Sequence, residues 1–140
     1  MHQKVILSSI SSDSHVWNLI YLQLLLEELN FEVINLGPSV ATQDLVKAYH
    51  RHKPEHLVIS SVNGHGYIKG IEIIRAVRQM NLLKNMKVVI GGKLSVNGMI
   101  SNEQIRNLHE EGFDGVFVKS TAIEEFRYYM QGKNRLMRVV

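Results

Sequence analysis

Residues 57–67 read Leu-Val-Ile-Ser-Ser-Val-Asn-Gly-His-Gly-Tyr, an apolar run that stops at a loop rich in Ser, Asn and Gly. The run shows no alternation of polar and apolar side chains, which is typical of a strand buried on both faces of a parallel sheet. Helical spacing follows, because Ile71, Ile74 and Val77 fall on one helix face. The stretch therefore predicts a strand, a loop and a helix, the repeating unit of an α/β domain.

The same unit recurs along the chain. Further apolar runs rich in Val, Ile or Leu lie at residues 5–7, 33–36, 88–90 and 116–118, and segments with helical spacing separate them. Five strands joined by right-handed helical crossovers form a doubly wound parallel sheet. For five strands we predict a flavodoxin-like (Rossmann-like) α/β fold with the strand order 2-1-3-4-5.

Composition sets the limits of the interpretation. The chain has 140 residues, a net charge of +3, 45% hydrophobic residues and no cysteine. These values exclude a disordered chain, a disulfide scaffold and a thiolate metal site. No apolar run approaches the roughly 18 residues of a membrane span, and no Lys/Arg run favours nucleic acid. We expect one cytoplasmic domain over residues 1–140, with its core at about 3–131 and a basic tail at 132–140.

Helix ends and one helix surface carry further signals. Ser101 with Gln104, and Thr121 with Glu124, both fit the capping box that begins a helix. The first helix is apolar on nearly all sides, so either neighbouring elements cover it or it faces a partner or a cofactor. We favour the second interpretation, because a domain of this length has few elements left to cover a second helix face.

Ligands of open α/β sheets bind at the carboxyl ends of the strands, where the strand order reverses. Three polar loops, at residues 8–15, 60–67 and 91–98, are predicted to meet there. Three histidines, His50, His52 and His56, fall at the opposite edge, where we expect them to be solvated loop residues.

All three loops contain groups that suit a ligand site. Asp13 lies two positions before His15, and a carboxylate beside an imidazole can fix its tautomer for metal binding or base catalysis. An Asp that only caps a helix is the simpler alternative. The Gly64-His65-Gly66 and Gly91-Gly92 stretches allow a ligand to approach the backbone closely, although tight turns would also explain them.

Together the three loops resemble the cobalamin-binding domain of the adenosylcobalamin-dependent mutases. The family pattern D-x-H-x-x-G, S-x-L and G-G corresponds here to residues 13–18, 60–62 and 91–92. Asn18 stands where the pattern has Gly, and Val62 stands where it has Leu. A domain of this length, with the stretch at residues 112–117, is most similar to the small subunits of glutamate mutases.

The resemblance implies a site and a partner. His15 would be the lower axial ligand of cobalt, Asp13 would hydrogen-bond its other ring nitrogen, and Ser60 would bind the displaced base of the nucleotide tail. A larger barrel-type catalytic subunit would bind the glutamate-like substrate, and the cofactor would be adenosylcobalamin. No catalytic residue is expected in this chain. The expected cofactor-binding residues are Asp13, Ser14, His15, Val16, Asn18, Ser60, Val62, Asn63, Gly64, Gly91, Gly92 and Thr121.

Two alternatives stay open at this point. A non-catalytic corrinoid module, either a methyl carrier or a sensor, would share the Asp13 and His15 loop. An electron carrier of the flavodoxin type that binds FMN would suit the Ser-rich first loop. The basic charge balance and the lack of paired aromatic residues for a flavin disfavour that second alternative.

Overall fold

A computed structural model describes residues 2–11, 13, 17–62, 64–79, 86–95, 99–118 and 121–132. Strands and helices alternate along this part of the chain, as the sequence predicts. In chain order they are β1 (Lys4–Ser8), α1 (Trp17–Glu28), β2 (Glu32–Asn35), α2 (Thr42–His52), β3 (His56–Ser61), α3 (Gly66–Arg78), β4 (Lys87–Gly92), α4 (Asn102–Glu111), β5 (Gly115–Phe117) and α5 (Ala122–Met130).

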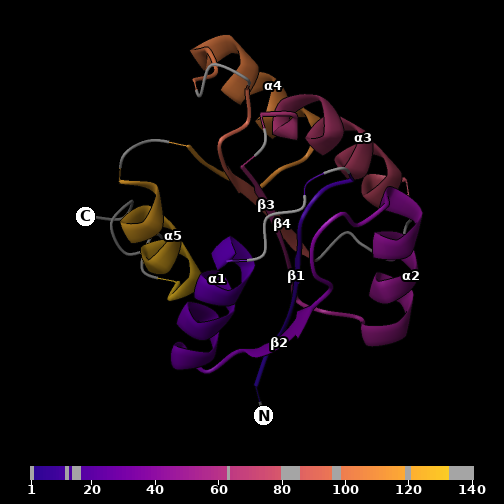
Figure 1. Cartoon of the computed structure of the whole chain (residues 1–140), viewed down its shortest axis with the longest axis vertical. Helices are drawn as coiled ribbons and strands as arrows, with labels where there is room; N and C mark the ends of the chain where they lie inside the picture. The colour runs from indigo at the N-terminus through magenta and orange to yellow at the C-terminus, as the bar shows by residue number, and fades with distance from the viewer. Residues whose placement is uncertain are drawn as a thin grey trace.

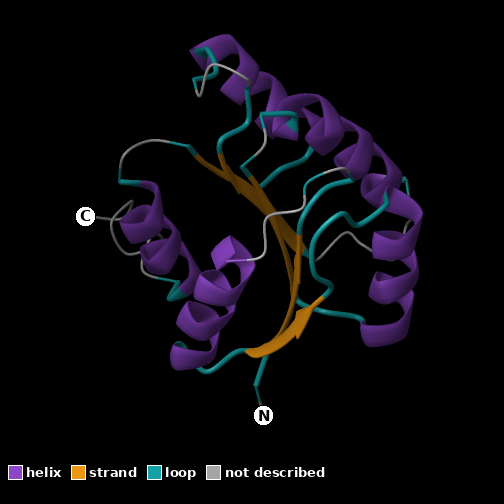
Figure 2. Ribbon diagram, viewed as in Figure 1, coloured by secondary structure: helices purple, strands orange, loops and turns teal. Residues whose placement is uncertain are grey.

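The strands form one sheet in the order β2-β1-β3-β4-β5, and each pair of neighbours is parallel. This confirms the predicted doubly wound flavodoxin-like topology. Helices α1 and α5 lie on one face of the sheet, and α2, α3 and α4 lie on the other (Figures 1 and 2). Each face has its own apolar core, so the sheet is buried on both sides. None of the described helices is long and apolar enough to cross a membrane.

The strands β3 and β4 extend further than the sequence indicated. Ser60 and Ser61 were expected in a loop, but they are the last residues of β3, where they pair with Gly91 and Gly92 of β4. Ladder hydrogen bonds join backbone groups, so small or polar side chains do not end a strand that has a partner on each side. The expected loops therefore begin later than predicted.

The two predicted capping boxes have different outcomes. Ser101 and Gln104 form a complete box at the start of α4. Thr121 makes no side-chain cap at α5, so the second prediction is wrong. The backbone of Thr121 has φ −95° and ψ 16° rather than an extended conformation. An N-cap hydroxyl reaches the free N–H groups from extended backbone, which Thr121 does not have.

The expectation for His56 is also wrong, because this residue belongs to β3 and not to a loop. Its ring packs edge-on against Phe31 at 5.5 Å between centroids, and its Nε2 lies 3.1 Å from Oε1 of Gln3. Its Nδ1 is buried and has no hydrogen-bond partner among the described residues. His50 and His52 lie in the last turn of α2 rather than in the loop that follows.

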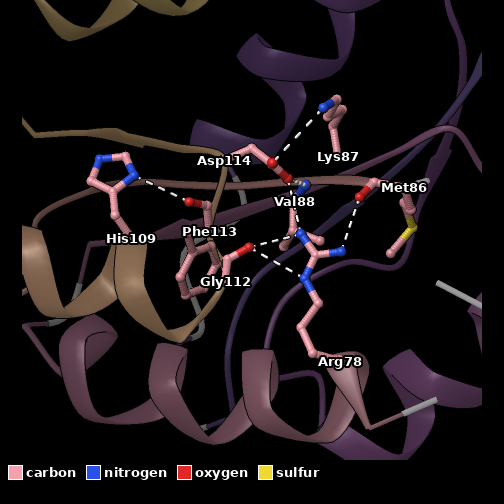
Figure 3. Close-up of polar contacts among 8 residues, drawn as sticks. All are labelled: Arg78, Met86, Lys87, Val88, His109, Gly112, Phe113 and Asp114. Carbon is pink, nitrogen blue, oxygen red and sulfur yellow. Dashed lines mark hydrogen bonds and ion pairs between the residues drawn. The ribbon is translucent and has the colours of Figure 1, made fainter. Parts of the chain in front are cut away.

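An arginine clamp ties together the end of α3, the start of β4 and the turn before β5 (Figure 3). Arg78 donates from Nη1 to the Met86 carbonyl at 3.1 Å and from Nη2 to the Gly112 carbonyl at 2.7 Å. Nη2 also donates to Oδ2 of Asp114 at 2.9 Å, and the same oxygen accepts the Val88 N–H at 2.8 Å. The clamp thus satisfies backbone groups where several elements end at the amino edge of the sheet.

Replacing the clamp residue by an apolar one of similar length should destabilise the fold. We expect Arg78→Met to lower the free energy of unfolding by about 2 kcal/mol, because two carbonyls and a carboxylate lose a charged donor. Urea denaturation measures this change. Arg106→Met on the exposed side of α4 is the matched control, and it should change stability by less than about 0.5 kcal/mol. Equal effects of the two substitutions would contradict the role of the clamp.

His56 predicts how stability depends on pH. Burial lowers its pKa from 6.5, with a further lowering by Lys87, while Glu55 and Asp114 act in the opposite direction. The folded protein therefore favours the neutral ring, so the stability from His56 is complete above pH 6.5 and is lost as the pH falls through the lowered pKa. His56→Gln should reduce the loss of unfolding free energy on acidification, as followed by urea titrations at several pH values. An exposed-histidine control, His50→Gln, should retain the original dependence.

Candidate functional site

A step in side-chain size opens a cavity on the α1 and α5 face of the sheet. In β3, Val58 and then Ser60 point to this face, and in β4 Val89 and then Gly91 do so. The ladder pairs Val58 with Val89 and Ser60 with Gly91. Towards the carboxyl ends the sheet therefore presents small side chains side by side, and the helices above them do not close the gap. The resulting cavity has a volume of about 250 Å³.

The walls of the cavity are mainly apolar. They come from α1, from the carboxyl ends of β3, β4 and β5, and from α5. The sequence motifs do not include most of these residues. Residues two positions apart in a strand face the same side of the sheet. Val58 and Val89 could therefore have been identified, because they lie two positions before Ser60 and Gly91, which were expected at the site. The contribution of α5 depends on how that helix packs against β5. The wall residues that were not singled out include Leu22, Val58, Val89, Phe117, Ala122 and Phe126.

One end of the cavity is polar. The Asn18 side chain, from the first turn of α1, donates through Nδ2 to the hydroxyl oxygen of Ser60 at 2.7 Å. Ser60 is only 5% exposed, and Asn18 is half-buried. Both residues line the cavity. A hydrogen-bonded amide and hydroxyl thus face an otherwise apolar space.

Asp13 holds the loop after β1 against its neighbours on both sides. Its side chain is buried, and its Oδ2 accepts the backbone N–H of Val62 at 2.9 Å. Its backbone carbonyl accepts the N–H of Ser39 at 2.7 Å. Helix α1 begins at Trp17, so the carboxylate joins the loops after β1 and β3 and is not the N-cap of that helix. The loop that carries His15 is therefore anchored just before that residue.

The structure brings together part of the predicted site. Asn18, Ser60, Val62, Gly91 and Gly92 all line the cavity. Asp13 lies beside it through Val62, whereas Gly64 and Thr121 do not line it. Ser14, His15, Val16 and Asn63 lie outside the described residues. Among the described residues, no group of three His, Cys, Asp or Glu side chains could hold a metal ion.

Comparison with known proteins assigns a family to this arrangement. A family model described as a B12 binding domain matches residues 3–127. The chain belongs to the B12-binding domain family. Glutamate mutase sigma subunit 1 of Haloarcula marismortui is 33% identical to this B12-binding domain over 125 residues, which are 89% of this chain and 82% of that one. Cobalamin is thus the cofactor class of the family, as the sequence motifs predict.

Solved structures place the fold of this B12-binding domain in a wider group. A cobalamin-binding protein from Desulfitobacterium hafniense DCB-2 superposes with a TM-score of 0.70 at 24% identity, over 99% of this chain. The chain spans 60% of the length of that protein. The chemotaxis response regulator CheY4 of Vibrio cholerae superposes with a TM-score of 0.67 at 16% identity over the full length of both chains. The fold alone therefore does not distinguish a cobalamin-binding protein from a response regulator.

The two glycines of the G-G motif are also required by the domain's own backbone. A Cβ on Gly91 would lie 2.9 Å from the Phe117 carbonyl oxygen. Gly92 has φ +105°, and a Cβ there would lie 2.1 Å from the Ser61 carbonyl oxygen. That carbonyl accepts the Lys93 N–H at 2.7 Å, so it cannot turn aside without losing a bond. The glycines thus allow the strand to end beside β3, whether or not a ligand contacts them.

This geometry predicts a large difference between two glycine substitutions. Gly37 also has a positive φ of +86°, but nothing lies within 4 Å of a Cβ built there. Gly37→Ala should therefore cost about 1–2 kcal/mol of unfolding free energy from backbone strain alone. Gly92→Ala should cost more than twice as much, because a steric clash adds to the strain. Chemical denaturation of the two variants checks this, and similar losses would show that the contact with Ser61 is not restrictive.

Proposed function

We propose that this chain is the cobalamin-binding subunit of an adenosylcobalamin-dependent mutase that interconverts glutamate and 3-methylaspartate. Its partner is a larger, barrel-type catalytic subunit that binds the substrate. The observation that carries the proposal is the similarity of nearly the whole chain to a glutamate mutase sigma subunit, at 33% identity. The chain is an isomerase component in this proposal and is not active alone.

The position and lining of the cavity support its assignment as the site of the nucleotide tail of a cobalamin. It lies between the sheet and the helices α1 and α5, its walls are mainly apolar, and its polar end contains Ser60 and Asn18. A flat heterocycle needs apolar walls for its faces and a few polar groups for its edge. The cavity is also next to the loop that Asp13 anchors. These features support a tail site beside a lower-ligand loop.

Each residue has a role in the proposal. His15 would ligate the cobalt of the cofactor, and Asp13 would anchor the loop that carries His15. Ser60, Val62, Gly91 and Gly92 line the site of the tail. When bound, adenosylcobalamin supplies the organic radical that starts carbon-skeleton rearrangements. The protein supplies binding and orientation, and the substrate contacts belong to the partner.

The outer surface of α1 supports a macromolecular partner. Ile20, Tyr21 and Leu24 are 40%, 51% and 61% exposed, while Leu19, Leu22, Leu25 and Leu26 of the same helix are buried against the sheet. Large apolar side chains grouped on one exposed helix face are typical of interaction surfaces. The sequence-based preference for a partner or cofactor surface on this helix stays a proposal.

The cobalamin spectrum of the purified chain tests the proposal. We expect added hydroxocobalamin to be retained, with the absorption spectrum of a form in which a histidine replaces the nucleotide base on cobalt. His15→Ala should lose that spectrum, because the replacing ligand is absent. His50→Ala, at the exposed end of α2, is the matched control and should retain it. If the chain does not retain cobalamin, or if the spectrum survives in His15→Ala, the proposed ligation is wrong.

Activity separates a mutase subunit from a methyl carrier or a sensor. Addition of a glutamate mutase catalytic subunit and adenosylcobalamin should give glutamate-to-methylaspartate turnover. Methyl transfer from methylcobalamin without such turnover would instead favour the carrier.

A further inference from the structure

The polar end of the cavity has more hydrogen-bonding capacity than the protein uses. The Ser60 oxygen accepts a hydrogen bond from Asn18, and this bond is the only one that either side chain makes within the described part of the chain. A hydroxyl also carries one proton to donate, and a side-chain amide also carries a carbonyl oxygen and a second N–H. Side by side, Asn18 and Ser60 therefore offer both a donor and an acceptor to a ligand.

Both groups are placed where a ligand would meet them. Ser60 is 5% exposed on the cavity floor, and Asn18 lies at the start of α1, which forms the cavity roof. The surrounding walls come from apolar residues such as Leu22, Val89 and Phe126. Among the described residues that line the cavity, no other polar side chain competes with these two. The edge of a heterocycle in this space would therefore be recognised mainly by the amide and the hydroxyl.

We propose that Asn18 makes this cavity selective for a corrinoid whose tail ends in a purine, such as adenine, over one whose tail ends in dimethylbenzimidazole. The inference rests on the proposed function, since it concerns the tail site of the same cofactor. The inference extends the proposed function by assigning a residue that determines specificity and the chemical class of the tail base.

The selectivity depends on whether the hydrogen-bonding groups of the tail base match those of Asn18. Adenine presents an amino donor beside a ring-nitrogen acceptor, and an asparagine amide pairs with such an edge through two parallel bonds. Dimethylbenzimidazole that is detached from cobalt presents one acceptor nitrogen and no donor. It therefore has no donor for the Asn18 carbonyl oxygen, which would be buried without a partner. A buried acceptor without a partner weakens binding roughly tenfold or more.

A binding comparison on the full chain tests this selectivity. Two cobamides with the same upper ligand, one with adenine and one with dimethylbenzimidazole as the tail base, are titrated into the protein, and the dissociation constants are obtained by absorbance and calorimetry. For the unchanged protein we expect the adenine form to bind about tenfold more tightly. Asn18→Leu replaces the amide by an apolar side chain of similar size, and it should bring the ratio of the two dissociation constants close to one.

Two further variants complete the design. Asn18→Gly removes the side chain altogether and should also bring the ratio close to one, which covers any packing disturbance caused by leucine. Gln23→Leu removes an amide from the same helix that bonds to Asn35 outside the cavity, and it should keep the original ratio.

The outcomes separate the two proposals. Equal affinities in the unchanged protein, tighter binding of the dimethylbenzimidazole form, or a preference that survives both Asn18 substitutions would each overturn the selectivity. In all three cases cobamide binding itself, and with it the proposed function, would stand. If neither cobamide binds, the proposed function fails and the selectivity fails with it.

Discussion

The parallel register between β3 and β4 is the constraint on which the candidate site depends. It sets Val58 beside Val89 and, two residues later, Ser60 beside Gly91, so that two small residues become neighbours on one face. A slip of one residue would turn the alternate side chains to the other face, where they would meet α2 and α3. The long apolar runs before these positions hold the register, because their side chains are buried on both faces.

The two edges of the sheet have different roles: contacts at the amino edge stabilise the fold, and the cavity lies at the carboxyl edge. At the amino edge, Arg78 and Asp114 satisfy backbone groups of several elements, and the half-buried His56 packs against Phe31. At the carboxyl edge, side chains become small, a glycine takes a positive φ, and the cavity opens. This arrangement lets the site contain polar and poorly packed groups while the opposite edge secures the strands. It is the general plan of doubly wound sheets, which bind ligands at the carboxyl ends of their strands.

The alternation of strands and helices could be predicted from the sequence because it depends on local patterns, and the strand order followed from the usual topology of five such units. The proposed site stays a prediction, although five of its expected residues line the cavity. The apolar runs have lengths and compositions that only buried strands fit, and Asp13, Ser60 and Gly91 follow or end such runs. The bond from Asn18 to Ser60 could not be predicted, since it joins residues 42 positions apart whose facing directions depend on how α1 crosses the sheet. The errors at Thr121 and His56 have the same origin. A backbone angle decided the first, and strand pairing that starts at His56 decided the second.

The replacement of the motif glycine by Asn18 has two opposite physical effects on the cavity. An amide takes up space that glycine would leave, which narrows the entrance from α1. It also places a polar group where the walls are otherwise apolar, and a buried amide is costly unless its donor and acceptor are both used. The hydrogen bond to Ser60 satisfies one donor of Asn18 and leaves its carbonyl oxygen without a protein donor among the described residues. A tail base that donates to this oxygen would offset the remaining cost, whereas an apolar base edge would increase it. The asparagine therefore reduces the space in the cavity and adds selectivity, at the polar end formed by Asn18 and Ser60 among the described lining residues.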